Sequence, residues 1–167
     1  MVILGVDPGL GATGYGIVET GRARPRVLAA GDIRSPSAWP MGERLIRIHT
    51  ILAELISRHR PDTVVLEKVF THSQHVTTAA LMAHARGVAC LVAKEHGIAL
   101  AEYPSTQVKR SLTGSGHASK EQVARMVGQW LRASDPSWSA DATDALALAL
   151  VHAHLVTQRR NLPAGVT

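Results

Sequence analysis

The chain has 167 residues, 46% of them hydrophobic, with 18 basic and 13 acidic side chains and a net charge of +5. This length and composition predict one globular domain and exclude a disordered or fibrous chain. The basic balance favours an anionic partner such as nucleic acid, although a merely soluble basic protein has the same charge.

Cysteine content and hydropathy exclude further classes of protein. The single cysteine, Cys90, excludes a disulfide within the chain and a cysteine-based zinc cluster. No apolar run approaches the roughly 20 residues that a membrane-spanning helix needs. The first residues lack the basic start of a signal peptide. We therefore expect a cytoplasmic protein with no membrane partner.

The first part of the chain is rich in strand patterns. Apolar runs predict strands at residues 2–7, 14–19 and 26–33, with a loop over 35–40. Apolar residues then recur at helical spacing from Met41 onward, and Arg60-Pro61 ends that helix. A fourth strand is predicted at 63–67.

The second part is mostly helical. Ser119 and Gln122 have the spacing of a capping box, which predicts that a helix begins after Ser119. The other predicted elements are a helix at 77–96, a strand at 98–103, a helical turn at 104–112, loops at 113–117 and 134–137, and a helix at 139–158. This order predicts an α/β fold with a mixed sheet, in which a hairpin meander is joined to parallel crossovers. We expect one domain over residues 1–158 and a flexible tail over 159–167.

Acidic residues end or begin three of these elements. Asp7 and Glu67 each end an apolar strand, and Asp141 and Asp144 open the last helix. Taken singly, each has an ordinary explanation: Asp7 suits a β-turn, Glu67 suits a surface strand end, and the pair suits the positive end of a helix. A carboxylate at the end of a buried strand is costly, however, unless it is paired or binds a cation.

Taken together, the acidic residues predict a metal site. If strands 2–7 and 63–67 are parallel neighbours, Asp7 and Glu67 project from the same edge of the sheet, where active sites of open α/β sheets lie. The spacing of three places Asp141 and Asp144 on one helix face. Oxygen ligands suit Mg²⁺ or Mn²⁺, and two such ions would activate water and stabilise a leaving oxygen. An acidic centre in a basic chain favours an enzyme that cuts a polyanion.

The glycines at 9, 11 and 14 match the dinucleotide-binding fingerprint, but their context does not. That fingerprint opens a helix, whereas residues 15–18 continue as a strand. We therefore interpret these glycines as a tight hairpin that leaves room near Asp7.

The motifs together resemble the RuvC family of crossover junction endodeoxyribonucleases, or Holliday junction resolvases. The resemblance covers about residues 2–155. Its matching segments are residues 5–9, 13–16, 67–70, 85–89, 107–109, 114–120 and 142–147. The stretch His72-Ser73-Gln74-His75 is less typical of the family, so the DNA contacts around it are left open.

This resemblance implies an RNase H-like fold with a five-stranded mixed sheet flanked by helices, and Mg²⁺-dependent nicking of four-way DNA junctions. It implies two metal ions per site, with Mn²⁺ as an acceptable substitute, held by Asp7, Glu67, Asp141 and Asp144. Some relatives place His where Asp141 stands. Hydrolysis would leave 5′-phosphate and 3′-hydroxyl ends.

The resemblance also assigns DNA contacts. Its aromatic residue after the second acid falls on Phe70, which would stack on an unpaired base, although core packing is the usual role of Phe. Its two functional lysines fall on Lys109 and Lys120, and Lys120 would also stabilise charge on the phosphate. His117 lies in the same glycine loop and is a further candidate for a phosphate contact.

A homodimer is expected because resolving a junction takes two symmetric cuts. The Ala-rich stretch in helix 77–96 is a candidate interface as well as ordinary core. The resemblance further implies the RuvA–RuvB branch-migration complex as a partner in recombination and repair. Three alternatives remain open: an RNase H-type nuclease acting on RNA–DNA hybrids, a junction-binding scaffold with an inactive site, and a sugar-kinase-like ATPase.

Overall fold

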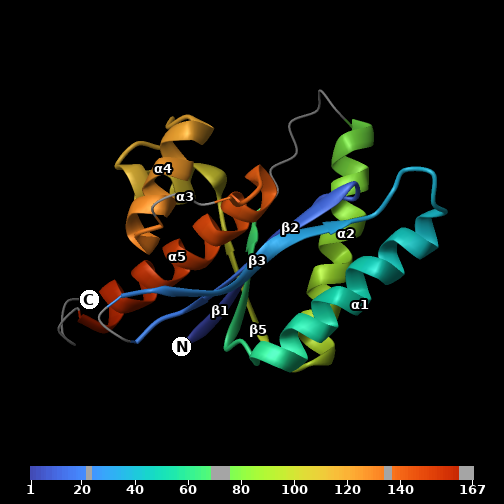
Figure 1. The fold of residues 1–167 in the computed structure, drawn as a ribbon, viewed down its shortest axis with the longest axis horizontal. Helices are drawn as coiled ribbons and strands as arrows, with labels where there is room; N and C mark the ends of the chain where they lie inside the picture. The colour runs from blue at the N-terminus through green and yellow to red at the C-terminus, as the bar shows by residue number, and fades with distance from the viewer. Residues whose placement is uncertain (22–23, 69–75, 134–136, 162–167) are drawn as a thin grey trace.

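The fold is a five-stranded mixed sheet between two layers of helices (Figure 1). The structure is a computed structural model that describes residues 1–167 except 22–23, 69–75, 134–136 and 162–167. The strands are β1 (Val2–Asp7), β2 (Ala12–Glu19), β3 (Arg26–Arg34), β4 (Thr63–Glu67) and β5 (Ala99–Tyr103), in the spatial order β3-β2-β1-β4-β5. The first three strands form an antiparallel meander, and β4 and β5 are parallel to β1. The predicted mixed topology is confirmed.

Helices cover both faces of this sheet. One face carries α1 (Met41–His59) and α2 (Val76–Glu95), and the other carries α3 (Ser105–Thr113), α4 (Lys120–Leu131) and α5 (Ala140–Asn161). In Figure 1, α5 crosses the sheet on the side opposite to α1. None of the helices in the described part of the chain is long and apolar enough to cross a membrane.

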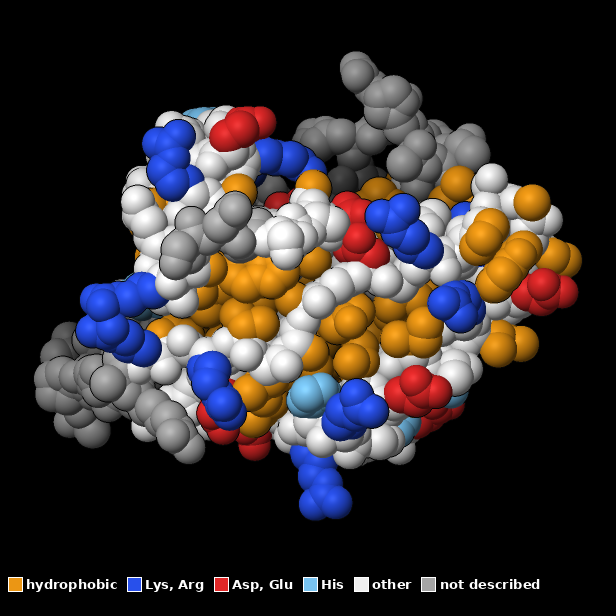
Figure 2. All heavy atoms as spheres, viewed as in Figure 1, with side chains coloured by type: hydrophobic (Ala, Val, Ile, Leu, Met, Phe, Trp, Pro, Cys, Tyr) orange, Lys and Arg blue, Asp and Glu red, His pale blue; other side chains and the backbone are white. Residues whose placement is uncertain are grey.

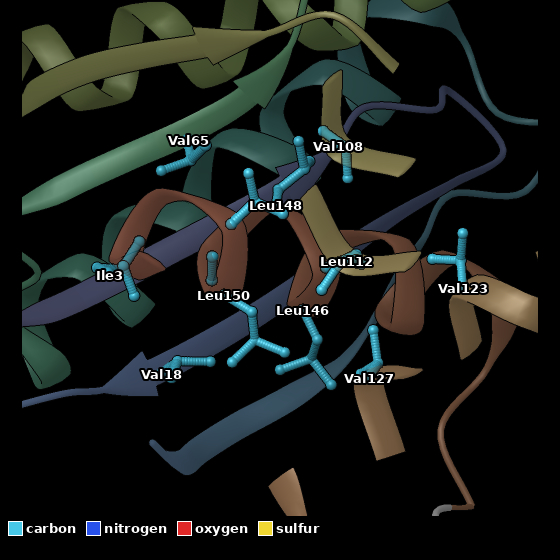
Figure 3. Packing of buried hydrophobic residues seen from close by; sticks show 14 of the residues in the cluster. Ile3, Val18, Val65, Val108, Leu112, Val123, Val127, Leu146, Leu148 and Leu150 are labelled. Carbon is cyan, nitrogen blue, oxygen red and sulfur yellow. The ribbon is translucent and has the colours of Figure 1, made fainter. Parts of the chain in front are cut away.

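Side chains along the central strands alternate between the two helical layers, as the pleat requires. Ile3 and Val65 are buried against the α5 layer, whereas Leu4, Val6 and Val64 are buried against α1 and α2. Figure 3 shows Leu146, Leu148 and Leu150 of α5 among strand residues such as Ile3 and Val18. The central strands are therefore apolar on both faces, and the first carboxylate appears where β1 ends.

Helix α5 lies unusually close to β1 and β2. A Cβ atom added to Gly5 would overlap the backbone carbonyl of Ala145, and one added to Gly14 would overlap that of Asp141. Only glycine at these positions lets the start of the helix rest on the strands. Gly14 therefore makes room beside Asp7, its partner in the β1–β2 register.

Most predicted elements are confirmed, with shifts at some ends. Strand β2 begins at Ala12 rather than at residue 14, because its ladder with β3 extends to Arg34. Helix α5 continues to Asn161, so residues 159–161, expected in the tail, are helical. No helix-breaking residue occurs until Pro163. Residues 162–167 lie outside the described part, and the expectation of a flexible tail there stays a prediction.

Candidate metal centre and nucleic-acid interface

Two strand-end carboxylates meet at one edge of the sheet. Strands β1 and β4 pair in parallel, with Val6 opposite Leu66, so Asp7 and Glu67 follow at neighbouring carboxyl ends. The prediction that these strands are parallel neighbours is confirmed. The adjacent residue of β5 is Tyr103, which pairs with Glu67 in the ladder.

Helix α5 brings the other two carboxylates to this edge. Asp141 lies in its first turn, against Gly14 of β2, and Asp144 follows one turn later. Asp7, Glu67 and Asp144 line one pocket of about 310 Å³. Asp141 is not among the residues that line this pocket, but its charge acts on Asp7. Four acidic residues from three separate segments are therefore gathered at one edge of the sheet.

Lys109 and Lys120 also line this pocket. Lys109 lies on α3, and Lys120 is the first residue of α4. The predicted capping box is confirmed: the Ser119 hydroxyl accepts from the Gln122 backbone N–H, and the Gln122 side chain accepts from the Ser119 N–H. This box fixes the start of α4 and, with it, the position of Lys120.

Lys120 is bonded to one of the carboxylates. Its Nζ donates to Oδ2 of Asp144 at 3.2 Å. The negative charge of Asp144 and this hydrogen bond raise the pKa of Lys120 above its ordinary value. The side chain of Lys120 is 74% exposed, so little of it is packed against the rest of the chain.

The charge of the site is strongly negative at its base. Burial, followed by the charges of Asp144, Glu67 and Asp141, raises the pKa of Asp7 to about 7, and Lys120 offsets part of that effect. Burial and the charge of Asp144 also raise the pKa of Glu67, with Lys109 and Lys120 acting in the opposite direction. Figure 2 shows acidic side chains near the upper centre of the viewed face, with Lys and Arg side chains beside them.

This donor set fits a hard divalent cation. Carboxylate oxygens are the ligands of Mg²⁺ and Mn²⁺, and a cation would relieve the repulsion that raises the pKa of Asp7. As the side chains of the described residues stand, no three His, Cys, Asp or Glu groups are close enough together to share one ion. The arrangement is thus a charged pocket in which Lys120 neutralises part of the acid.

The other two residues predicted to contact DNA, His117 and Phe70, are not part of the described pocket wall. His117 is exposed in the loop between α3 and α4 and is not among the residues that line the pocket; its backbone N–H donates to the Ser115 hydroxyl at 3.3 Å. Phe70 lies outside the described residues, as does the atypical stretch 72–75. Their predicted contacts with DNA stay predictions.

Ser105 and Met82 also line the pocket, and the sequence analysis assigned neither of them a role in the site. Ser105 follows Pro104 directly after β5, and Met82 comes from α2. A signal for Ser105 was available, because a parallel crossover to the predicted strand 98–103 would bring the end of that strand to the same edge. In the sequence, Met82 is one apolar residue of an apolar helix. Its place in the pocket wall depends on how α2 lies against the sheet, which the sequence does not show.

The geometry defines an α/β domain whose acidic, lysine-flanked pocket suits phosphate chemistry. The comparisons agree with this class. A family model described as crossover junction endodeoxyribonuclease RuvC matches residues 3–152. The chain is 47% identical over 152 residues to crossover junction endodeoxyribonuclease RuvC of Halorhodospira halophila, a match that covers 91% of this chain and 89% of that relative. The corresponding protein of Bradyrhizobium diazoefficiens is 43% identical over 152 residues, covering 91% and 86%.

A solved structure shows the same fold. Thermus thermophilus RuvC in complex with a Holliday junction substrate matches with a TM-score of 0.88 at 35% identity, covering 95% of this chain and 96% of that chain. The chain belongs to the RuvC family of crossover junction endodeoxyribonucleases. The RNase H-like fold expected from the sequence is thereby confirmed.

Proposed function

We propose that this chain resolves four-way DNA junctions by paired, symmetric nicks, in recombination and repair. The observation that carries the proposal is the pocket in which Asp7, Glu67 and Asp144 face Lys109 and Lys120. Acidic groups suit cations, lysines suit phosphates, and both are needed to hydrolyse a phosphodiester. Family membership supports a junction as the substrate.

Asp7, Glu67, Asp141 and Asp144 are proposed to hold two Mg²⁺ ions, with Mn²⁺ as a substitute. Bound divalent cations supply activation of water and neutralisation of charge on the reacting phosphate. Within the chain, Asp7 contributes a carboxylate that is half-buried and fixed at the end of β1. Asp144 becomes available as a ligand when Lys120 turns from its carboxylate to the phosphate.

Lys120 and Lys109 are proposed to hold and orient the DNA strand. Both line the pocket that the carboxylates line, so an ammonium group lies close to where a phosphate would enter. Charge that gathers on the phosphate oxygens would be stabilised by Lys120. The proposed products carry 5′-phosphate and 3′-hydroxyl ends.

Phe70 is proposed to stack on an unpaired base beside the cut, and His117 to contact a phosphate. Phe70 follows Glu67 by three residues, which ties it to the strand that carries a proposed ligand. Base stacking is worth about 1–3 kcal/mol. Replacement Phe70→Ala is expected to weaken cleavage while the melting temperature stays unchanged; a large loss of stability would assign Phe70 to the core instead.

The proposal includes a homodimer, because one set of four carboxylates serves one cut and a junction needs two. Helix α2 supports it with exposed apolar side chains: Leu81 and Leu91 are 36% and 53% exposed. Two copies that join through α2 along a twofold axis would bury these side chains and match the symmetry of a junction.

A matched pair of substitutions tests this interface. Leu91→Glu on α2 is expected to give monomers in sedimentation at micromolar concentration. Ile46→Glu on α1, where Ile46 is 67% exposed, is expected to leave the dimer intact. A monomeric wild-type protein, or equal effects of the two substitutions, would remove the α2 interface from the account.

The substrate is tested by incubating the protein with a synthetic four-way junction and with an RNA–DNA hybrid, each with and without Mg²⁺. We expect symmetric nicks in the junction alone, and only with Mg²⁺. Preferential cutting of the hybrid would favour an RNase H-type nuclease, and junction binding without nicking would favour a scaffold. The same proposal includes binding to the RuvA–RuvB complex, which co-sedimentation with RuvA–RuvB on a junction tests. It also includes a cytoplasmic location, where bacterial DNA lies.

A further inference from the structure

We infer that Asp32 and Ser139 act as positioning residues that set where Asp141 and Asp144 lie. The inference rests on the proposed role of those two carboxylates as metal ligands. Asp32 is on β3, and Ser139 directly precedes α5. The Ser139 hydroxyl donates to Oδ1 of Asp32 at 2.5 Å, a contact between residues 107 positions apart in the chain.

Ser139 ties this contact to the first turn of α5. Its hydroxyl oxygen accepts from the backbone N–H of Ala142 at 3.1 Å, the bond that an N-cap residue makes. Its carbonyl accepts from the backbone N–H of Thr143 at 3.0 Å and from the Thr143 hydroxyl at 2.8 Å. The bonds made by Ser139 therefore reach the two residues that lie between Asp141 and Asp144.

Asp32 ties the same contact to the sheet. It lies opposite Gly14 in the β2–β3 register, and Gly14 in turn lies opposite Asp7 of β1. Its side chain is only 12% exposed and lies 3.7 Å from a guanidinium nitrogen of Arg34. The carboxylate that receives the Ser139 hydroxyl is thus held in place from its own strand, across the ladder that ends at Asp7.

The Asp32–Ser139 bond matters because contact between the backbones of α5 and β2 does not by itself fix the rotation of the helix. Gly14 allows the start of α5 to touch β2 but has no side chain with which to hold it. The Asp32–Ser139 bond supplies a directional contact at that point. It determines how the first turn of α5 is rotated, and hence where the carboxylates of Asp141 and Asp144 lie relative to Asp7. Groups that orient metal ligands in this way commonly change metal affinity about 10- to 100-fold when removed.

A purely structural cap would predict a different outcome. An N-cap stabilises its helix wherever the helix lies, so its loss lowers the melting temperature without changing cation affinity. A positioning contact changes cation affinity even where the chain stays folded. The readout is therefore Mn²⁺ affinity, measured by calorimetric titration at a temperature where each variant is folded.

Two removals and two conservative replacements form the test. Asp32→Ala and Ser139→Ala remove the bond, and each is expected to weaken Mn²⁺ binding by roughly 10-fold. Asp32→Asn keeps an acceptor oxygen and Ser139→Thr keeps the hydroxyl, so both are expected to bind within about twofold of wild type. If Asp32→Ala does not fold, the Ser139 pair alone decides the question.

Glu19→Ala is the matched control. Glu19 is a carboxylate that bonds Arg26 across the same two strands, at the end far from Asp7. It is expected to leave Mn²⁺ affinity unchanged. Unchanged affinity in both Asp32→Ala and Ser139→Ala, with normal binding by wild type, would overturn the inference. Absence of Mn²⁺ binding by wild type would instead overturn the proposed function.

Discussion

The two faces of the sheet are covered in different ways. On the α5 face, glycines at positions 5, 14 and 16 let the helix backbone rest on the strands. On the α1–α2 face, large aliphatic side chains such as Leu4, Ile17 and Leu66 keep the helices at an ordinary distance. Of the two layers, the α5 layer brings the carboxylates of Asp141 and Asp144 close enough to act on Asp7 at the end of β1.

The two helical layers therefore have different roles. The α1–α2 layer buries apolar surface, and its outer side, with Leu91 on α2, is the proposed surface for a second copy. The α5 layer gives up side-chain volume at the interface so that backbone and carboxylates reach the sheet edge. We therefore expect substitutions at the α5 contact to damage the site, and equivalent substitutions on α1 to leave it intact.

The largest expected effect comes from the carboxylates. Asp7→Asn and Asp144→Asn keep the shape of each side chain but remove a charge, so Mg²⁺-dependent nicking is expected to fall by about 10³-fold or more while junction binding persists. The control is Glu54→Gln, an exposed carboxylate on α1. Full nicking by Asp7→Asn on a synthetic junction would remove Asp7 from the mechanism.

The close helix contact gives the next largest effect. Gly14→Ala places a methyl group against the backbone of Asp141, and such overpacking costs about 1–3 kcal/mol. Gly42→Ala on α1 meets nothing within 4 Å and is expected to gain a few tenths of a kcal/mol from helix propensity. Urea unfolding of both variants checks this; equal free energies of unfolding would show that the two faces do not differ as described.

An effect of pH on stability is also expected, and its sign follows from the raised pKa of Asp7. Its carboxyl has an ordinary pKa of 3.8 and a pKa of about 7 in the folded chain. The folded state therefore holds this proton more tightly than the unfolded state, and the resulting stability is complete below pH 3.8 and lost as the pH rises through 7. The variant Asp7→Asn does not lose this stability, because its side chain does not ionise.

Melting temperatures in the presence of a chelator test the pH effect. We expect Asp7→Asn to be more stable than wild type above pH 7, with the difference shrinking toward pH 4. Glu54→Gln serves again as the control. A difference that is constant across this range would mean that Asp7 titrates normally in the folded chain.

The smallest expected effect concerns DNA binding. Lys109→Gln removes a pocket-lining ammonium group, so the slope of log affinity for a junction against log salt is expected to fall by about 1. Lys94→Gln, in the last turn of α2, is the control for loss of one charge. Equal slopes for wild type and Lys109→Gln would argue against a phosphate contact.

The main residues of the site could be placed from the sequence. A strand that ends in a carboxylate fixes that residue at the sheet edge once the strand order is known, and so Asp7 and Glu67 could be placed together. The capping box located Lys120 for a similar reason, since its geometry is local.

Contacts that depend on packing distance could not be predicted. Asp32 and Ser139 lie 107 positions apart, and neither occurs in a motif. His152 is another example: burial and the charge of Arg159 lower its pKa, and its Nδ1 lies 2.8 Å from the Tyr103 hydroxyl. This bond could not be predicted, because a polar residue in the pattern of an apolar helix does not reveal which residue it faces.

A titration of the chain with Mn²⁺ tests most directly whether the distant carboxylates converge on cations. Two ions bound per wild-type chain, and loss of binding in both Asp7→Asn and Asp144→Asn, are the predicted result. Wild-type affinity retained by both variants would contradict the account.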